Sequence, residues 1–137
     1  MRVFLDANIL FSAANPKWHT SKLVQWLIKN ASCVTSNYAT EEARRNLKTS
    51  FPEHVAGLET LLGKIEMQDA GIFEIGDGIE LSEKDRPILA AAMASGSTHL
   101  LTGDKKDFKE LLGKTIWNVR VVTQKMLAEE LEKRGMI

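Results

Sequence analysis

The 137-residue sequence contains one cysteine, three prolines and no excess of charge of either sign. Because Cys33 stands alone, an internal disulfide and a zinc site built from several cysteines are both excluded, as is typical of proteins in a reducing cytosol. The 18 basic side chains balance the 18 acidic ones, so there is no overall basic field for nucleic acid. Any such binding must therefore use a local patch.

Long apolar runs are also missing. No stretch approaches the roughly 20 apolar residues that a membrane span requires. Asp6 interrupts the apolar start of the chain too early to leave room for the apolar region of a signal peptide. These absences predict a cytoplasmic protein that does not associate with membranes.

What is present suits one globular domain over residues 1–137, with 44% hydrophobic and 26% charged residues. Short apolar stretches that read as strands alternate with amphipathic stretches that read as helices. Strands are expected at 3–5, 32–35, 72–75, 100–102 and 119–122, and helices at 21–30, 38–48, 54–67, 82–95, 107–112 and 123–133. This alternation predicts an α/β fold of three layers, α/β/α, with a mostly parallel central sheet.

Four acidic residues fall at positions where sheets of this kind usually bind ligands. Asp6 directly follows the first strand, and Asp104 lies just beyond a later one. Glu42 lies beside the apolar stripe of a helix, and Asp85 lies near the start of another. The carboxyl ends of parallel strands form a crevice, and carboxylates that share a pocket repel one another unless a cation joins them. The sequence thus predicts metal-assisted chemistry on a phosphate.

Each acid also has a structural alternative. Asp6 can cap the turn that follows it, and Asp85 completes a capping box with Ser82. Asp107 can cap a short helix, whereas Asp104 has no comparably good structural role. Glu41 is an alternative to Glu42, since adjacent helical side chains diverge by about 100°, and either can be a solvated residue paired with a neighbouring arginine.

Four segments resemble the motifs of the PIN domain, in the right order and over nearly the whole chain. The resemblance implies a parallel sheet between helices and a divalent-metal ribonuclease acting on single-stranded RNA, in many cases the toxin of a toxin–antitoxin pair. It matches Asp6, Glu42, Asp85 and Asp104 to the catalytic, metal-binding quartet. Asn8 and Thr102 match supporting polar residues, and Asp107 matches an acid that varies in the last motif. The segments are LDANIL at 5–10, EARRNL at 42–47, DRPILAAA at 85–92 and LTGDKKDF at 101–108.

Carboxylate oxygens without histidine or cysteine favour Mg²⁺ or Mn²⁺ over zinc. We expect Asp6 and Asp104 to hold metal directly, with Glu42 and Asp85 completing the shell through water or a second ion. The resemblance further implies products with a 5′-phosphate and a 3′-hydroxyl.

Basic side chains near the acids are candidate contacts to the phosphate backbone, with simple solvation as the alternative. They are Arg44, Arg45, Lys105 and Lys106. The expected partners are single-stranded RNA, an antitoxin protein and a second copy of the chain, since three tryptophans leave apolar surface to bury.

Three other functions compete with the ribonuclease hypothesis. A receiver-type phosphotransfer domain needs a lysine after a later strand, but here the candidates directly follow an acid. A phosphatase of the haloacid-dehalogenase type needs a second aspartate where Asn8 stands. The remaining alternative is a non-catalytic, PIN-like scaffold that binds RNA or protein.

Overall fold

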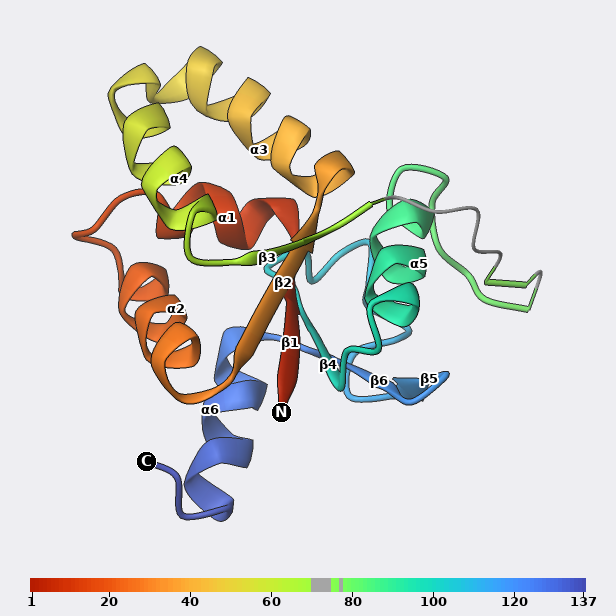
Figure 1. Ribbon diagram of the computed structural model, residues 1–137. Helices are drawn as coiled ribbons and strands as arrows, with labels where there is room; N and C mark the ends of the chain where they lie inside the picture. The colour runs from red at the N-terminus through yellow and green to blue at the C-terminus, as the bar shows by residue number, and fades with distance from the viewer. Residues whose placement is uncertain (70–74, 77) are drawn as a thin grey trace.

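The computed structural model describes residues 1–69, 75–76 and 78–137. Within these residues, six strands form one sheet in the order β3-β2-β1-β4-β6-β5 (Figure 1). All neighbouring strands are parallel except β5 and β6. The strands are β1 (Arg2–Leu5), β2 (Ser32–Ser36), β3 (Glu66–Gln68), β4 (His99–Leu101), β5 (Thr115–Ile116) and β6 (Val119–Val122).

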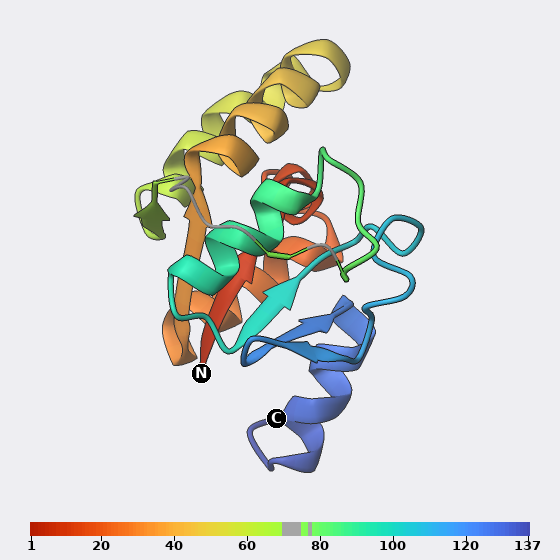
Figure 2. The same ribbon diagram turned by 90° about the vertical axis from the view of Figure 1, so that its right-hand side faces the viewer.

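Helices cover both faces of this sheet. In Figure 1, α5 lies on one side of the strands and α2 and α6 lie on the other, while Figure 2 shows α5 in front of the sheet. α1, α3 and α4 pack against one another beyond the carboxyl ends of the strands. The helices are α1 (Ala7–Ala13), α2 (His19–Asn30), α3 (Asn37–Ser50), η1 (Pro52–His54), α4 (Val55–Leu62), α5 (Arg86–Ala94) and α6 (Gln124–Lys133). The predicted three-layer α/β architecture is confirmed.

The strand order places a crevice beside β1. The chain leaves β1 for β2 and β3, and then returns to the other side of β1 as β4. Leu5 pairs with Leu101, and the backbone amide of Asp6 donates to the carbonyl of Leu101 at 3.1 Å. Residues that follow β1 and β4 therefore meet at a topological switch point, where open α/β sheets bind ligands.

The central strands are buried on both faces. Phe4 and Leu5 of β1 and Leu100 and Leu101 of β4 are fully buried. Strands that are covered on both sides read as continuous apolar runs instead of an alternating pattern, which is why the sequence revealed them. Among the described residues, no helix combines the length and apolar character needed to cross a bilayer.

Several expected elements differ from the structure. The segment after β1 was expected to be a loop, but it forms α1, whose buried Ile9, Leu10 and Ala13 recur at helical spacing. The helix expected at 54–67 ends at Leu62, and β3 follows it, parallel to β2. β3 was missed because its polar side chains are mostly exposed, so backbone pairing with β2 determines its conformation.

Further differences concern the second half of the chain. The helix expected at 107–112 is a series of turns, and the antiparallel strand β5 was not expected. The helix expected from 82 begins only at Arg86, because residues 83–85 form the turn before it. The strand expected at 72–75 falls, apart from Ile75, outside the described residues.

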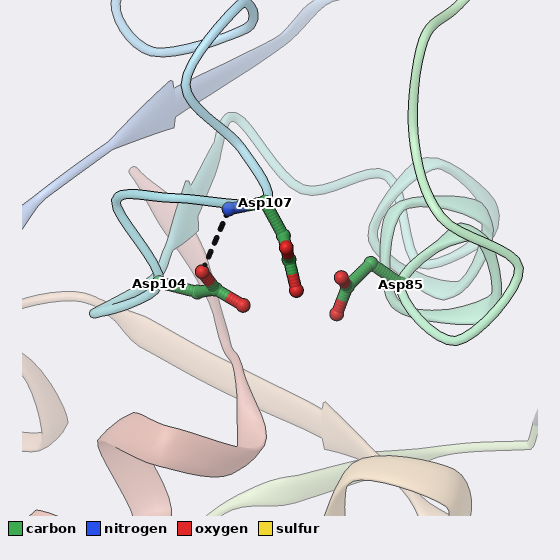
Figure 3. Close-up of side chains that lie close together, drawn as sticks. All are labelled: Asp85, Asp104 and Asp107. Carbon is green, nitrogen blue, oxygen red and sulfur yellow. Dashed lines mark hydrogen bonds between the residues drawn. The ribbon is translucent and has the colours of Figure 1, made fainter.

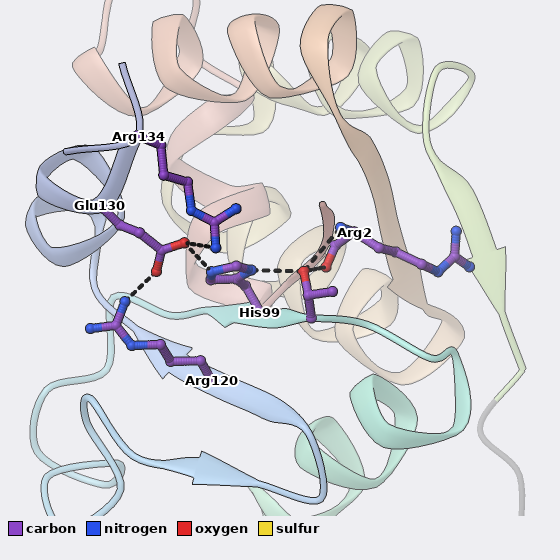
Figure 4. Close-up of polar contacts among 6 residues, drawn as sticks. Arg2, His99, Arg120, Glu130 and Arg134 are labelled. Atoms are coloured by element: carbon purple, nitrogen blue, oxygen red, sulfur yellow. Dashed lines mark hydrogen bonds and ion pairs between the residues drawn. The ribbon is translucent and has the colours of Figure 1, made fainter. Parts of the chain in front are cut away.

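A buried ion cluster lies near the amino ends of β4 and β6. Glu130 of α6 accepts a 2.8 Å hydrogen bond from Nε2 of His99 and pairs with Arg134 at 2.9 Å and with Arg120 (Figure 4). Burial lowers the pKa of His99 below its ordinary value. Burial opposes the charged form of Glu130, but the hydrogen bond from His99 and the two arginines outweigh it and lower the pKa of that carboxyl. This cluster fastens α6 to the sheet, away from the crevice.

Candidate active site

All four acids of the expected quartet line one cavity of about 420 Å³ at the carboxyl ends of β1 and β4. The structure thus brings together side chains from four separate segments of the chain. The lining side chains among the described residues are Asp6, Asn8, Phe11, Ser12, Glu42, Asn46, Thr49, Ser50, Lys84, Asp85 and Asp104.

Asp6 is buried at the floor of this cavity, with 3% of its surface exposed. It caps α1, since its Oδ1 accepts from the amide of Ala7 at 2.6 Å, and its Oδ2 accepts from the hydroxyl of Thr102 at 2.7 Å. Burial raises the pKa of Asp6 to about 6, against the effect of these two hydrogen bonds, and the charges of Asp85 and Glu42 add to the rise. Asp6 therefore both caps α1 and contributes its carboxylate to the acidic cavity.

Thr102 and Asn8 connect the two strand ends. The Thr102 hydroxyl also accepts from the amide of Asp104 at 3.0 Å, and Asn8 Oδ1 accepts from the amide of Gly103 at 2.8 Å. A Cβ atom at Gly103 would lie only 3.3 Å from Asn8 Oδ1, so a side chain there would push against that bond. These contacts hold the segment after β4 against α1 and set the direction in which Asp104 points.

Asp85, Asp104 and Asp107 form a tight carboxylate group (Figure 3). One oxygen from each of the three lies within 4.8 Å of the others. Burial raises the pKa of Asp85; a hydrogen bond from Ser82 opposes the rise, and Asp107 and the Asp104 charge add to it. Carboxylates this close favour either a shared proton or a bound cation.

Two expectations about the structural roles of these acids need correction. Asp104 was expected to have no structural role, but its Oδ1 accepts from the amide of Asp107 at 2.9 Å. Asp107 was expected to cap a helix at 107–112, but no helix forms there and its amide is the donor in this pair. Asp85 does exchange hydrogen bonds with Ser82, at 2.7 Å through Oδ2 and 3.3 Å through its amide, as the capping-box alternative requires.

Glu42 and Glu41 occupy different environments on α3. The Glu42 side chain is 14% exposed, lines the cavity and pairs with Lys84 at 2.9 Å. The Glu41 side chain is 69% exposed and pairs with Arg44 at 2.7 Å. The structure therefore places Glu42 in the cavity and Glu41 on the solvent side, paired as the solvated alternative describes.

The four basic candidates lie outside the lining of the acidic cavity. Arg44 is held between Glu41 and Glu59, the latter at 2.7 Å, and with Arg45 it lines a separate cavity of about 300 Å³. Lys105 and Lys106 are exposed in the turn that follows Asp104.

Lys84, which lines the cavity, was not singled out from the sequence. Its only sequence signal is that it directly precedes Asp85. The charge of Glu42 and the hydrogen bond to it raise the pKa of Lys84 above its ordinary value.

Aromatic side chains form one wall beside the cavity. Trp18 packs against Phe11 and Phe51, with ring centroids 6.3 Å and 5.6 Å apart, and His54 stacks on Phe51 at 5.4 Å. Trp18 thus has a packing role, in which it supports the cavity-lining Phe11.

The residues of the site fit a hard divalent cation. Asp85, Asp104 and Asp107 offer three carboxylate oxygens within a few ångström of one another. Mg²⁺ and Mn²⁺ prefer such oxygen ligands, whereas zinc sites favour histidine and cysteine. Burial is the main cause of the raised pKa values of Asp6 and Asp85, and the neighbouring acids add to both.

No protein-family model matches the sequence, and no curated protein matches it. Solved structures do match the fold. VapBC2 from Rickettsia felis, bound to a DNA fragment from its promoter, matches with a TM-score of 0.68 and 22% identity, over 90% of this chain and 98% of that chain. DNA-bound VapBC from Salmonella typhimurium matches with a TM-score of 0.64 and 17% identity, over the same shares of the two chains.

A third match is VapC20 from Mycobacterium tuberculosis, described as a sarcin-ricin loop cleaving toxin. It has a TM-score of 0.56 and 12% identity, over 79% of this chain and 94% of that chain. The alignments span nearly the whole length of each matched chain, so the likeness concerns a complete fold and not a shared fragment. The sheet order, the acidic switch point and these matches together establish that the chain has the PIN-domain fold seen in VapC-type toxin structures.

Proposed function

We propose that this protein is a divalent-metal-dependent endoribonuclease that hydrolyses phosphodiester bonds of single-stranded RNA. The observation that carries the proposal is the gathering of Asp6, Glu42, Asp85 and Asp104 around one cavity at the switch point of a PIN fold. The cavity is open enough for a phosphate and is lined by hydroxyl and amide groups that can donate to its oxygens, those of Ser12, Asn46, Thr49 and Ser50.

In this proposal Asp6 and Asp104 would hold the metal directly, Glu42 and Asp85 would complete its shell, and Asp107 would support them from beside Asp85 and Asp104. A Mg²⁺ or Mn²⁺ ion held there would supply Lewis-acid polarisation of the scissile phosphate and a lower pKa for the attacking water. Thr102 keeps Oδ2 of Asp6 in place, and Asn8 fixes the neighbouring loop. These supporting groups orient the carboxylates before the substrate arrives, which limits the reorganisation needed during the reaction.

The proposed biological setting is a cytoplasmic toxin–antitoxin pair. The matched VapBC structures, and that of FitAB bound to a DNA fragment, are complexes of two proteins with DNA. We infer that this chain likewise binds an antitoxin protein, and that two copies of this chain associate. Purification together with the product of an adjacent gene, followed by sedimentation, tests the antitoxin partner.

Incubation of the purified protein with labelled single-stranded RNA and Mn²⁺ tests the activity. Asp6→Asn and Asp104→Asn should each lower the cleavage rate by at least about 100-fold, because each removes a metal-binding charge. Glu41→Gln is the matched control, since it makes the same change of acid to amide outside the cavity. Near-normal cleavage by both aspartate variants would exclude the proposed site. A wild-type protein that binds RNA but never cleaves it would favour the non-catalytic scaffold.

A further inference from the structure

Lys84 is the one basic side chain among the described residues that line the acidic cavity. Its Nζ lies 2.9 Å from Oε1 of Glu42. The Glu42 side chain is largely buried, whereas that of Lys84 is 64% exposed. The ammonium group therefore reaches from the solvent side onto a carboxylate of the proposed metal site.

Two contacts with the same helix fix the position of Lys84. The Tyr38 hydroxyl donates to the backbone carbonyl of Lys84 at 2.9 Å, and the side chain of Lys84 pairs with Glu42. Tyr38 and Glu42 are four residues apart on α3, so both lie on one face of that helix. The next residue, Asp85, is buried and directly precedes α5. Lys84 is thus anchored through its backbone as well as through its charge.

The ion pair sets Glu42 apart from the group of three aspartates. Asp85, Asp104 and Asp107 face one another without a basic partner among the described residues. Glu42, by contrast, already has a positive charge at hydrogen-bonding distance. A divalent ion and an ammonium group repel each other, so each lowers the affinity of the Glu42 carboxylate for the other.

We propose that Lys84 competes with divalent metal for Glu42, and so weakens metal binding on the α3 side of the cavity while neutralising that side in the metal-free protein. This inference rests on the proposed metal-dependent nuclease function. It places the first ion on the aspartates of the site, of which Asp85, Asp104 and Asp107 lie close together. It also makes occupancy of the α3 side depend on displacement of the lysine, which its exposed, flexible side chain permits.

The test is Mn²⁺ binding, measured by calorimetry on the intact protein without RNA. Lys84→Met should bind Mn²⁺ roughly tenfold more tightly than the wild type, since a competing charge beside Glu42 is gone. Lys84→Arg, which keeps the charge, should remain near wild type. Lys105→Met is the matched control, because Lys105 follows Asp104 but forms none of the ion pairs found among the described residues.

Glu42→Gln identifies the partner of the lysine. When residue 42 is already glutamine, Lys84→Met should change Mn²⁺ affinity no more than Lys105→Met does. The reason is that the side chain of residue 42 then carries no negative charge for which the lysine and the metal compete. Thermal melts give a second readout. Lys84→Met should lower the melting temperature of the metal-free protein and enlarge the rise in melting temperature that Mn²⁺ causes. If Lys84 had only a structural role, its loss would lower the melting temperature equally with and without Mn²⁺.

Unchanged or weaker Mn²⁺ binding by Lys84→Met would overturn the inference, as would an equal effect of that change in the Glu42→Gln background. If the wild type binds Mn²⁺ and cleaves RNA, and Lys84→Met has the same Mn²⁺ affinity as the wild type, only the proposed role of the lysine is excluded. If neither the wild type nor Lys84→Met binds Mn²⁺, the inference and the proposed function fail together.

Discussion

The hydroxyl of Thr102 donates to Oδ2 of Asp6 at 2.7 Å and joins the ends of two neighbouring strands. The hydroxyl oxygen of Thr102 also accepts from the amide of Asp104 at 3.0 Å. One side chain therefore orients two of the four acids, and it does so from a fully buried position.

Replacing this hydroxyl should damage both stability and metal binding. In Thr102→Val the carboxylate of Asp6 loses a donor and the amide of Asp104 loses an acceptor. Leaving buried polar groups unpaired costs about 1–3 kcal/mol each. We expect a lower melting temperature at neutral pH and weaker Mn²⁺ binding by calorimetry. Thr102→Ser, which keeps the hydroxyl, is the control, and equal behaviour of the two variants would contradict this role.

Glu42 should matter more than Glu41 for metal-dependent cleavage. Glu42→Gln removes a charge from the cavity, whereas Glu41→Gln only breaks an exposed pair with Arg44, worth about 0–1 kcal/mol. Cleavage rates of the two variants at one Mn²⁺ concentration provide the comparison. A larger loss for Glu41→Gln would reverse the assignment.

The Asp6 carboxyl should make the metal-free protein less stable as the pH rises from about 4 to above 6. Burial raises the pKa of Asp6 to about 6 from an ordinary value of 3.8, so in this range the folded state binds more protons than the unfolded state. Such a difference lowers the free energy of unfolding by about 3 kcal/mol over the range. Asp85 acts in the same direction. Melting temperatures across this range should fall less steeply for Asp6→Asn than for the wild type.

Divalent metal should reverse this loss. Metal that binds only the folded state adds about 2.7 kcal/mol at 100 times its dissociation constant. Protons compete for the same carboxylates, so the rise in melting temperature with Mn²⁺ should be larger at about pH 7.5 than at about pH 5.5. A melting temperature that ignores millimolar Mn²⁺ at the higher pH would count against a metal site.

The cluster around Glu130 should contribute to stability alone. Glu130→Gln leaves His99, Arg120 and Arg134 without their shared carboxylate, and we expect a loss of about 1–3 kcal/mol in the free energy of unfolding. Mn²⁺ affinity should not change, because the cluster lies near the amino ends of β4 and β6, whereas the acidic cavity lies at the carboxyl ends of β1 and β4. Glu129→Gln, an exposed neighbour on the same helix, is the control. Altered Mn²⁺ binding in Glu130→Gln would show that the two regions are coupled.

Association of two copies should appear at micromolar concentration. Trp117 is 71% exposed at the turn between β5 and β6, and Met67 and Ile137 also expose large apolar side chains. Burial of such surface between copies would contribute about 25 cal/mol per Å² of apolar area. Sedimentation that detects only a 15.3 kDa species would exclude the dimer.

The sequence revealed the parts of the fold that burial determines. β1, β4 and β6 are apolar runs enclosed on both faces, and the acids were found because Asp6 and Asp104 follow two of these runs. Parallel strands carry their ends to one edge, so the gathering of these two acids followed from topology alone. Helix phase was enough to direct Glu42 inward and Glu41 outward.

The remaining features depend on contacts between distant segments. β3 has the polar sequence EMQ and adopts strand geometry because it pairs with β2. α1 has only seven residues, too few for a clear periodic signal. The ion pair between Lys84 and Glu42 arises from tertiary placement. No local pattern around these residues distinguishes them from ordinary surface charges.

The hydrogen bond between Thr102 and Asp6 spans 96 positions of the chain, which has a consequence during synthesis. A nascent polypeptide that ends before β4 carries Asp6 and Glu42 but lacks the partners that complete the cavity. Because long-range pairing must wait for the later strand to emerge, the acidic cavity cannot assemble on an unfinished chain. The proposed nuclease activity would therefore be absent until the segment with Asp104 has left the ribosome.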